Sequence, residues 1–174
     1  MSFLSAPIRL IAPRCRWALS TRLQAQKVEQ MRLTKFTDYA LRVLLLAANR
    51  QEDRITIEDA ANFYDISQSH LKKVVMELSR AGYLIGTKGR TGGFRLGKDP
   101  KEINLGDVLR LTETDFGLFE CQVGGGSCII LPCCKLPLVA KRAARAFLAV
   151  FDEVTLADVL SEPTAFAQLG LPGK

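Results

Sequence analysis

The 174-residue sequence contains one histidine, His70, and no apolar run that approaches the length of a membrane-spanning helix. A single histidine leaves no Ser/His/Asp or Cys/His hydrolytic set unless His70 itself takes part. A membrane span needs roughly 18 consecutive apolar residues. The three glycines at 124–126 lack the lysine and the helix of a phosphate-binding loop. These absences point away from a hydrolase, a nucleotide-binding enzyme and a membrane protein, so we expect neither enzymatic activity nor a membrane partner.

Acidic residues are scarce in the first thirty positions. Residues 1–30 hold five basic residues and one acid, Glu29, as arginine-rich organelle transit peptides do. Met31, however, opens a well-patterned sequence, and we expect 1–30 to be a disordered arm or a mis-assigned start. Cys15 in this arm is given no role. Residues 31–174 carry 19 basic and 17 acidic residues, so the body of the chain is nearly neutral.

A second acid-poor stretch, 68–98, lies within this body, and Glu77 is its only acid. Its seven basic residues are Lys72, Lys73, Arg80, Lys88, Arg90, Arg95 and Lys98. A local charge of +6 on a nearly neutral body is typical of one face that meets a polyanion. We therefore expect this stretch to bind double-stranded DNA.

The spacing of apolar residues predicts three helices in the first half of the body. The first is expected over 34–49. Thr56, with Asp59 as its reciprocal partner, is expected to cap a short second helix that runs to about Tyr64. A turn at 65–67 then leads to a longer third helix. A short helix, a tight turn and a longer helix form a helix-turn-helix.

The third helix is predicted to be the one that reads DNA. It is expected over 68–81, with Ser67 as its N-cap. The first two turns of such a helix usually reach base edges in the major groove. The candidate contact residues there are Gln68, Ser69, Lys72 and Lys73. His70 projects from the same helix and is therefore a poor candidate for a metal ligand.

Two short strands are expected after Gly82, at 84–88 and 93–96, joined by a glycine-containing turn. A hairpin directly after a helix-turn-helix is a wing. Its tip carries Arg90, flanked by Lys88 and Arg95, and this charge suits a phosphate or the narrow minor groove. The predicted fold class is mainly α with a small β-hairpin wing. A protein-docking winged helix with a solvated basic face is the alternative.

The C-terminal half is predicted to contain a short helix at 105–111, an irregular loop and a long helix at about 138–153. Phe147, Leu148 and Phe151 give the long helix a heavy apolar load, so we expect it to form a homodimer. The expected organisation is an arm (1–30), a winged helix-turn-helix domain (31–114), a cysteine loop (115–136), a dimerisation helix (137–160) and a loose tail (161–174).

Four of the five cysteines lie between 121 and 134. Such grouping is typical of a metal or redox site in a reducing compartment, so we expect a cytoplasmic protein. Thiolates suit iron–sulfur clusters, Zn²⁺ or Cu(I). Cys121, Cys128 and Cys134 are separated by six and five residues, wider than the pairs of structural zinc sites, which favours a cluster. A zinc-stabilised interaction module and a thiol redox enzyme using Cys133 and Cys134 remain as alternatives.

Four segments, in this order, resemble one known family. They are MRLTKFTDYALRVLLLAA (31–48), SQSHLKKVVMELSRAGYL (67–84), GRTGG (89–93) and the cysteine stretch 121–136. Over about residues 31–160 the sequence resembles the Rrf2-type family of bacterial regulators, most closely its branch of nitric-oxide-sensing (NsrR-type) repressors.

The resemblance implies a homodimeric repressor with an iron–sulfur cluster on each subunit, 4Fe–4S in preference to 2Fe–2S, and nitric oxide as its signal. It implies Cys121, Cys128 and Cys134 as ligands, with Cys133 at a non-ligand position and the partner's Asp38 as fourth ligand. Pro137 stands where the IscR-type branch has a histidine ligand. An iron- or redox-responsive regulator of the same family is the alternative function.

Overall fold

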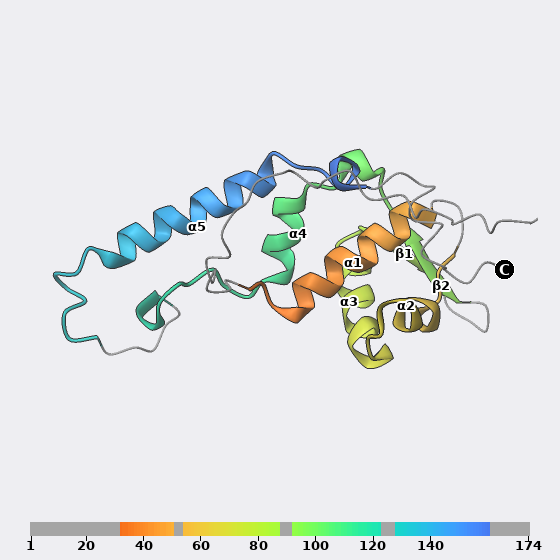
Figure 1. The fold of residues 1–174 in the computed structure, drawn as a ribbon, viewed down its shortest axis with the longest axis horizontal. Helices are drawn as coiled ribbons and strands as arrows, with labels where there is room; N and C mark the ends of the chain where they lie inside the picture. The colour runs from red at the N-terminus through yellow and green to blue at the C-terminus, as the bar shows by residue number, and fades with distance from the viewer. Residues whose placement is uncertain (1–31, 51–53, 88–91, 123–127, 161–174) are drawn as a thin grey trace, which may run out of the picture. The chain divides into compact units, whose positions relative to one another are not determined.

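The computed structural model describes residues 32–50, 54–87, 92–122 and 128–160. The chain divides into two units, Met1–Arg32 and Leu33–Lys174, and every element named below belongs to the second. Its elements are α1 (Lys35–Arg50), α2 (Ile57–Tyr64), α3 (Gln68–Arg80), β1 (Leu84–Thr87), β2 (Gly93–Leu96), η1 (Pro100–Glu102), α4 (Leu105–Thr112), η2 (Glu120–Gln122), α5 (Leu136–Asp152) and η3 (Ala157–Val159) (Figure 1). The expectations for 1–30 and for the tail 161–174 fall outside the described residues.

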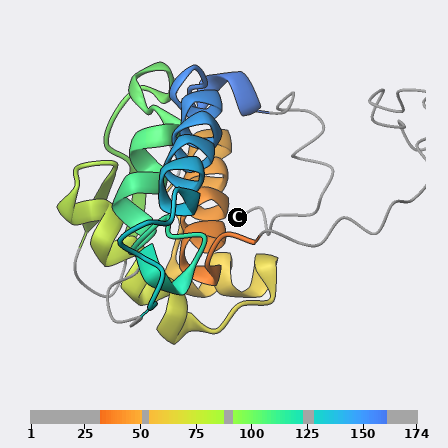
Figure 2. The same ribbon diagram turned by 90° about the vertical axis from the view of Figure 1, so that its left-hand side faces the viewer.

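The core is built around α1, which packs against α3, α4 and β2. Ala40, Val43, Leu44 and Ala47 occupy positions i, i+3, i+4 and i+7 on one face of α1 and are all almost fully buried. Leu71, Val74 and Leu78 form the matching buried stripe of α3. Figure 1 shows α4 between α5 and α1, and α4 packs against both; in Figure 2 α5 (blue) is seen in front of α1 (orange), with α4 (green) beside them. Helices α3 and α5 are therefore connected through two intervening helices, α1 and α4.

The turn between α2 and α3 follows from local hydrogen bonding. The Thr56 hydroxyl accepts from the Asp59 N–H (3.0 Å), and the Asp59 carboxylate accepts from the Thr56 N–H (3.2 Å), which completes the predicted capping box. Asp65 ends α2 in the left-handed conformation (φ 52°), and the Ile66 N–H donates back to the Ala61 carbonyl. The chain thus reverses over three residues and starts α3 at Gln68, as predicted.

The wing is a small antiparallel sheet in which Leu84 pairs with Leu96 and Thr87 with Gly93. Ile55 extends it by exchanging two backbone hydrogen bonds with Phe94 (3.0 and 2.9 Å). Gly93 is required here, because a Cβ at this position would lie 2.7 Å from the Ile55 carbonyl oxygen. The mainly α fold with a β-hairpin wing is confirmed.

Helix α5 begins at Leu136, two residues before its predicted start. Pro137 is accommodated because the first turn of a helix does not use the N–H that proline lacks. Phe151 and Val154 pack against the core of the chain itself, so their apolar character does not require a partner. Among the described residues, no helix has the length and apolar character needed to cross a membrane.

Candidate functional site

Helix α3 presents a polar face opposite its buried stripe. Gln68, Ser69, Lys72 and Lys73 are all exposed on it, in the first two turns. This is the arrangement expected of a helix whose first turns enter a major groove. No acid stands in the first turn of α3, and Glu77 pairs with Arg80 (3.6 Å) near the other end. The start of the helix therefore offers donors and positive charge without a competing carboxylate on the same turn.

Ser67 occupies the N-cap position of α3 as predicted, but its side chain does not cap the helix. The Ser67 hydroxyl instead lies 3.0 Å from His70 Nδ1 and 3.2 Å from Ser69 Oγ. The prediction of a serine side-chain cap was wrong because the imidazole competes for the hydroxyl. His70 also lies near the Tyr39 ring of α1, with centroids 6.3 Å apart. The only histidine of the chain is thus engaged by Ser67 and Tyr39 at the start of α3.

The described part of the wing exposes Arg95, whereas its neighbour Phe94 is buried. The other two predicted wing contacts, Lys88 and Arg90, lie outside the described residues. Sequence reasoning missed Arg54, which is exposed and precedes the Ile55 bridge to β2. Its Cβ lies close to Gly93, so it adds a cation beside the wing. Only the long-range pairing of Ile55 with Phe94 brings it there.

The two adjacent cysteines differ in their hydrogen bonding. Cys134 lies just before α5, and its sulfur accepts a hydrogen bond from the Leu136 N–H (3.4 Å). Cys133 is more exposed, and its Sγ–H donates to the Ile130 carbonyl (3.3 Å). A backbone N–H that points at a sulfur stabilises a thiolate at that position, as it would a sulfur bound to a metal. Of the pair, Cys134 is the one whose sulfur accepts a hydrogen bond from a backbone N–H.

Cys121 and Cys128 complete the set of free thiols in the described residues from 121 to 134. Cys121 lies in η2, and the adjacent Gln122 side chain donates to the Pro137 carbonyl (3.5 Å). The turn that carries Cys121 is thereby held beside the start of α5, close to where Cys134 lies in the chain. Cys128 is exposed and begins the turn that leads to Cys133.

The turn between Cys128 and Cys133 exposes three large apolar side chains. Ile129, Ile130 and Leu131 are 94%, 56% and 40% exposed. A thiolate site gains from apolar surroundings that exclude water, because solvent access affects the potential and stability of a bound metal centre. Ile129, Ile130 and Leu131 are the apolar side chains that stand between Cys128 and Cys133 in the chain.

Asp38, the predicted oxygen ligand, is paired with Arg42 one turn along α1. Arg42 Nε donates to Asp38 Oδ1 (3.1 Å), and Arg42 Nη2 lies 2.9 Å from Oδ2. The Arg42 guanidinium also lies over the Tyr64 ring (5.9 Å), and the Tyr64 hydroxyl donates to the Arg42 carbonyl (2.9 Å). Burial raises the pKa of Tyr64 to about 12, against the lowering effect of Arg42. The Asp38 carboxylate is thus connected, through Arg42, to the end of α2.

The described residues do not bring these ligand candidates into one coordination sphere. No three His, Cys, Asp or Glu side chains in the described ranges are placed to hold a single metal ion. The donor chemistry nevertheless fits an iron–sulfur cluster, since three free thiols of one loop are soft ligands and one already accepts an N–H···S hydrogen bond. In the described part of the chain, Asp38 is not grouped with the cysteines.

Comparison with known proteins identifies the family. The Rrf2 family model, described as an iron-dependent transcriptional regulator, matches residues 33–162. The crystal structure of CymR from Staphylococcus aureus superposes with a TM-score of 0.59 at 25% identity, covering 74% of this chain and 98% of that one. The winged-helix fold is therefore shared with a solved regulator of bacterial origin.

Two relatives share more of the sequence. The HTH-type transcriptional regulator NsrR of Bacillus licheniformis is 47% identical over 132 residues, which are 75% of this chain and 92% of that protein. The NsrR of Bacillus subtilis is 46% identical over 132 residues, which are 75% of this chain and 90% of that protein. The resemblance read from the sequence is confirmed, and the chain belongs to the Rrf2 family of iron-dependent transcriptional regulators.

Proposed function

We propose that this transcriptional regulator is a cytoplasmic, homodimeric repressor whose affinity for its operator depends on an iron–sulfur cluster and falls when nitric oxide reacts with that cluster. The proposed ligands are Cys121, Cys128 and Cys134, with the partner's Asp38 as the fourth. A 4Fe–4S cluster fits three thiolates and one exchangeable carboxylate. We propose no catalytic role for any residue, since the only histidine is engaged on α3.

The observation that carries this proposal is the difference between the adjacent cysteines. The Cys134 sulfur accepts a hydrogen bond from the Leu136 N–H at the start of α5, whereas the Cys133 Sγ–H donates a hydrogen bond to the Ile130 carbonyl. A bound cluster supplies iron atoms that react with nitric oxide. Loss of Cys134 as a ligand would free the start of α5. The assignment of Cys133 as a non-ligand, first implied by the resemblance, gains a physical reason from this geometry.

Asp38 can leave its present partner at little cost. The Arg42 and Asp38 side chains are 44% and 46% exposed, and exposed ion pairs contribute only about 0.2–1 kcal/mol. A bond to iron in a second subunit is a stronger interaction than this surface pair. Arg42 would then retain the Tyr64 ring as its neighbour.

A second copy of the chain is also what the exposed side of α5 favours. Val139, Ala143, Ala146 and Val150 are exposed and recur at spacings of four, three and four residues. This is the spacing of a coiled-coil seam. A homodimer through this stripe would cover apolar surface and give two reading helices for a two-fold operator.

The test begins with anaerobic purification. We expect a brown protein whose visible absorption is lost in Cys121→Ala, Cys128→Ala and Cys134→Ala and retained in Cys133→Ala. Titration with nitric oxide should bleach the wild type and release a duplex operator in parallel. An iron chelator and an oxidant, applied separately, serve as comparison signals.

Other outcomes would replace the proposal. A colourless protein that contains one zinc ion per chain would favour the zinc-stabilised module. Release of operator by the chelator or oxidant, but not by nitric oxide, would favour an iron- or redox-responsive regulator. Loss of colour in Cys133→Ala with a brown Cys134→Ala would overturn the ligand assignment.

A further inference from the structure

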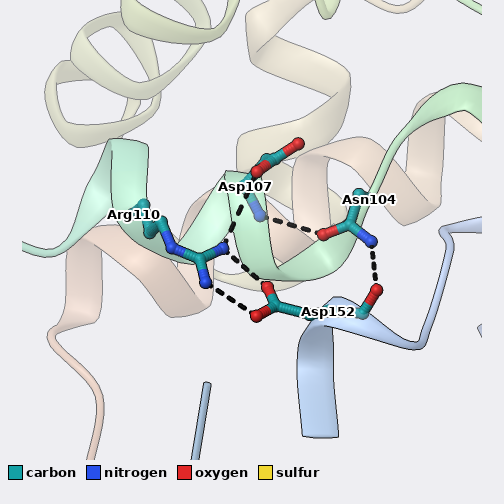
Figure 3. A network of polar contacts seen from close by, with 4 residues as sticks. All are labelled: Asn104, Asp107, Arg110 and Asp152. Atoms are coloured by element: carbon teal, nitrogen blue, oxygen red, sulfur yellow. Dashed lines mark hydrogen bonds and ion pairs between the residues drawn. The ribbon is translucent and has the colours of Figure 1, made fainter. Parts of the chain in front are cut away.

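A polar network joins the end of α5 to both ends of α4 (Figure 3). Arg110 makes two parallel contacts with Asp152, Nη1 to Oδ1 (2.6 Å) and Nη2 to Oδ2 (2.7 Å). Asn104, the N-cap of α4, also donates to the Asp152 backbone carbonyl (2.7 Å). The hydrogen bonds from Arg110 hold the pKa of the Asp152 carboxyl below its usual value, so the pair stays charged near neutral pH.

Asp152 in α5 and Gly106 in α4 are both residue types that are unfavourable at their positions in these helices. Asp152 stands in the last turn of α5, where the helix dipole disfavours an acid and no basic residue is present. Gly106 lies within α4, where glycine is a poor helix former. A Cβ at Gly106 would clash with Asp152 Oδ1 and come within 3.0 Å of Arg110 Nη1. Each residue therefore costs its own helix some stability, and both are needed for the close contact between Arg110 and Asp152.

This contact adds little to global stability, because Arg110 and Asp152 are 44% and 40% exposed. Its effect is geometric. A fork of two parallel hydrogen bonds fixes the relative orientation of the two side chains, which a single contact does not. The backbone beyond Asp152 is also tied to α4, since the Leu105 N–H donates to the Val154 carbonyl (3.0 Å).

Helix α5 connects this contact to the cysteines. Ala140 is the one buried residue of α5, whereas Leu138 and Val139 are more than half exposed. Cys134 lies directly before α5 and is hydrogen-bonded to its first turn. With 17 residues α5 is roughly 25 Å long, so a 10° change in its direction at Asp152 moves its start by about 4 Å.

We infer that Arg110 and Asp152 are a positioning pair that sets the direction of α5, and hence the place of Cys134, relative to the DNA-binding core. The effect of this pair would pass from α5 to α4, from α4 to α1 and from α1 to α3, because the helices of each pair are in contact. The inference rests on the proposed function, since it assigns to this pair the coupling between the cysteine site and operator affinity. Neither residue touches DNA or a ligand in this role.

The test measures operator affinity of cluster-loaded and cluster-free full-length protein for Arg110→Gln, Asp152→Asn and the double variant. The ratio of the two affinities should fall by about 2- to 30-fold, which is the usual range for residues that modulate coupling. The double variant should match the single variants, because they break the same contact. Cluster-free affinity and the midpoint of thermal unfolding should stay near wild type. A purely structural role would change the midpoint and leave the ratio intact.

Two further variants sharpen the result. Gly106→Ala should lower the ratio without changing any charge. Asp107→Asn removes the other carboxylate near Arg110 (3.7 Å), which lies on α4 itself, and should leave the ratio unchanged. An unchanged ratio in Arg110→Gln and Asp152→Asn, with a wild type that does distinguish the two states, overturns the inference.

Hydrogen exchange separates this inference from the proposed function. In cluster-free protein, the amides of α5 should exchange faster in Arg110→Gln than in Asp107→Asn, because the end of α5 is less constrained. If the wild type binds operator equally with and without cluster, the proposed function fails, and exchange still decides whether the pair constrains α5. Equal exchange in both variants overturns the inference on its own.

Discussion

Replacing Asp38 with alanine separates a ligand from a surface charge. In cluster-free protein the change removes the pairing with Arg42 and a first-turn acid of α1. At 46% exposure of Asp38, the pair contributes about 0.2–1 kcal/mol, and the helix-dipole contribution is about 0.3–1 kcal/mol. We therefore expect unfolding free energy to fall by about 1 kcal/mol, or roughly 2–4 °C in a chain of this size. Cluster-free DNA binding should not change.

The cluster-loaded protein should respond far more. If Asp38 is the ligand that couples the site to α1, its loss should remove most of the coupling, which is typically about 5- to 150-fold in affinity. The visible spectrum should also shift while three thiolates still hold the cluster. Absorption and circular dichroism spectra, and operator titrations at matched cluster content, measure both effects.

Arg42→Gln is the matched control, since it breaks the same ion pair and leaves the carboxylate in place. It should reproduce the small loss of stability and retain both the spectrum and the high affinity of the loaded form. Equal effects of Asp38→Ala and Arg42→Gln on loaded-state affinity would refute the reasoning. Asp38 would then act through its ion pair, and the fourth ligand would be another group.

Three further predictions concern DNA contact, packing and pH. Lys72→Ala should cost about 1–3 kcal/mol of discrimination between operator and random duplex. Arg95→Ala should instead weaken binding to every duplex and reduce the slope of log affinity against log salt by about one. Competition binding over a range of salt concentrations measures both, and the same behaviour of the two variants would contradict this assignment of roles. Leu44→Ala, at a fully buried position, should lower the free energy of unfolding by about 2–5 kcal/mol. Met76→Ala, at an exposed position, should lower it by less than about 0.5 kcal/mol, and denaturant titrations measure both. Since burial raises the pKa of Tyr64 from 10.0 to about 12, its contribution to stability should be complete below pH 10 and lost as pH rises towards 12; phenolate absorption that appears with a midpoint near 10 would contradict this.

Local interactions explain why much of the fold could be predicted. Thr56, Asp59 and Asn104 cap their helices through groups within three residues, and Gly82 supplies the left-handed residue after α3 (φ 77°). Such contacts depend on the neighbouring sequence alone. The predicted side-chain cap at Ser67 was wrong because two other local partners, Ser69 and His70, compete for its hydroxyl within one turn.

Long-range contacts account for what the sequence did not reveal. Arg110 and Asp152 are 42 residues apart, and both are ordinary surface charges until α4 meets α5. Arg54 joins the wing only through the pairing of its neighbour Ile55 with Phe94. The ligand roles came from the family resemblance, and they remain predictions. The opposite hydrogen bonding of Cys133 and Cys134 depends on the geometry of one turn, which spacing does not encode.

If Asp38 is the ligand proposed above, helix α1 serves two tasks on opposite sides, and this has a consequence for how such regulators diversify. Its buried side, with Val43 and Leu44, belongs to the DNA-binding core, while Asp38 lies on its partly exposed side. With that role for Asp38, substitutions on the exposed side would alter the cluster site without repacking the residues that support α3. A designer who wishes to exchange the sensor of this protein while retaining its operator should graft the cysteine loop together with the exposed positions of α1, and leave the buried ones untouched.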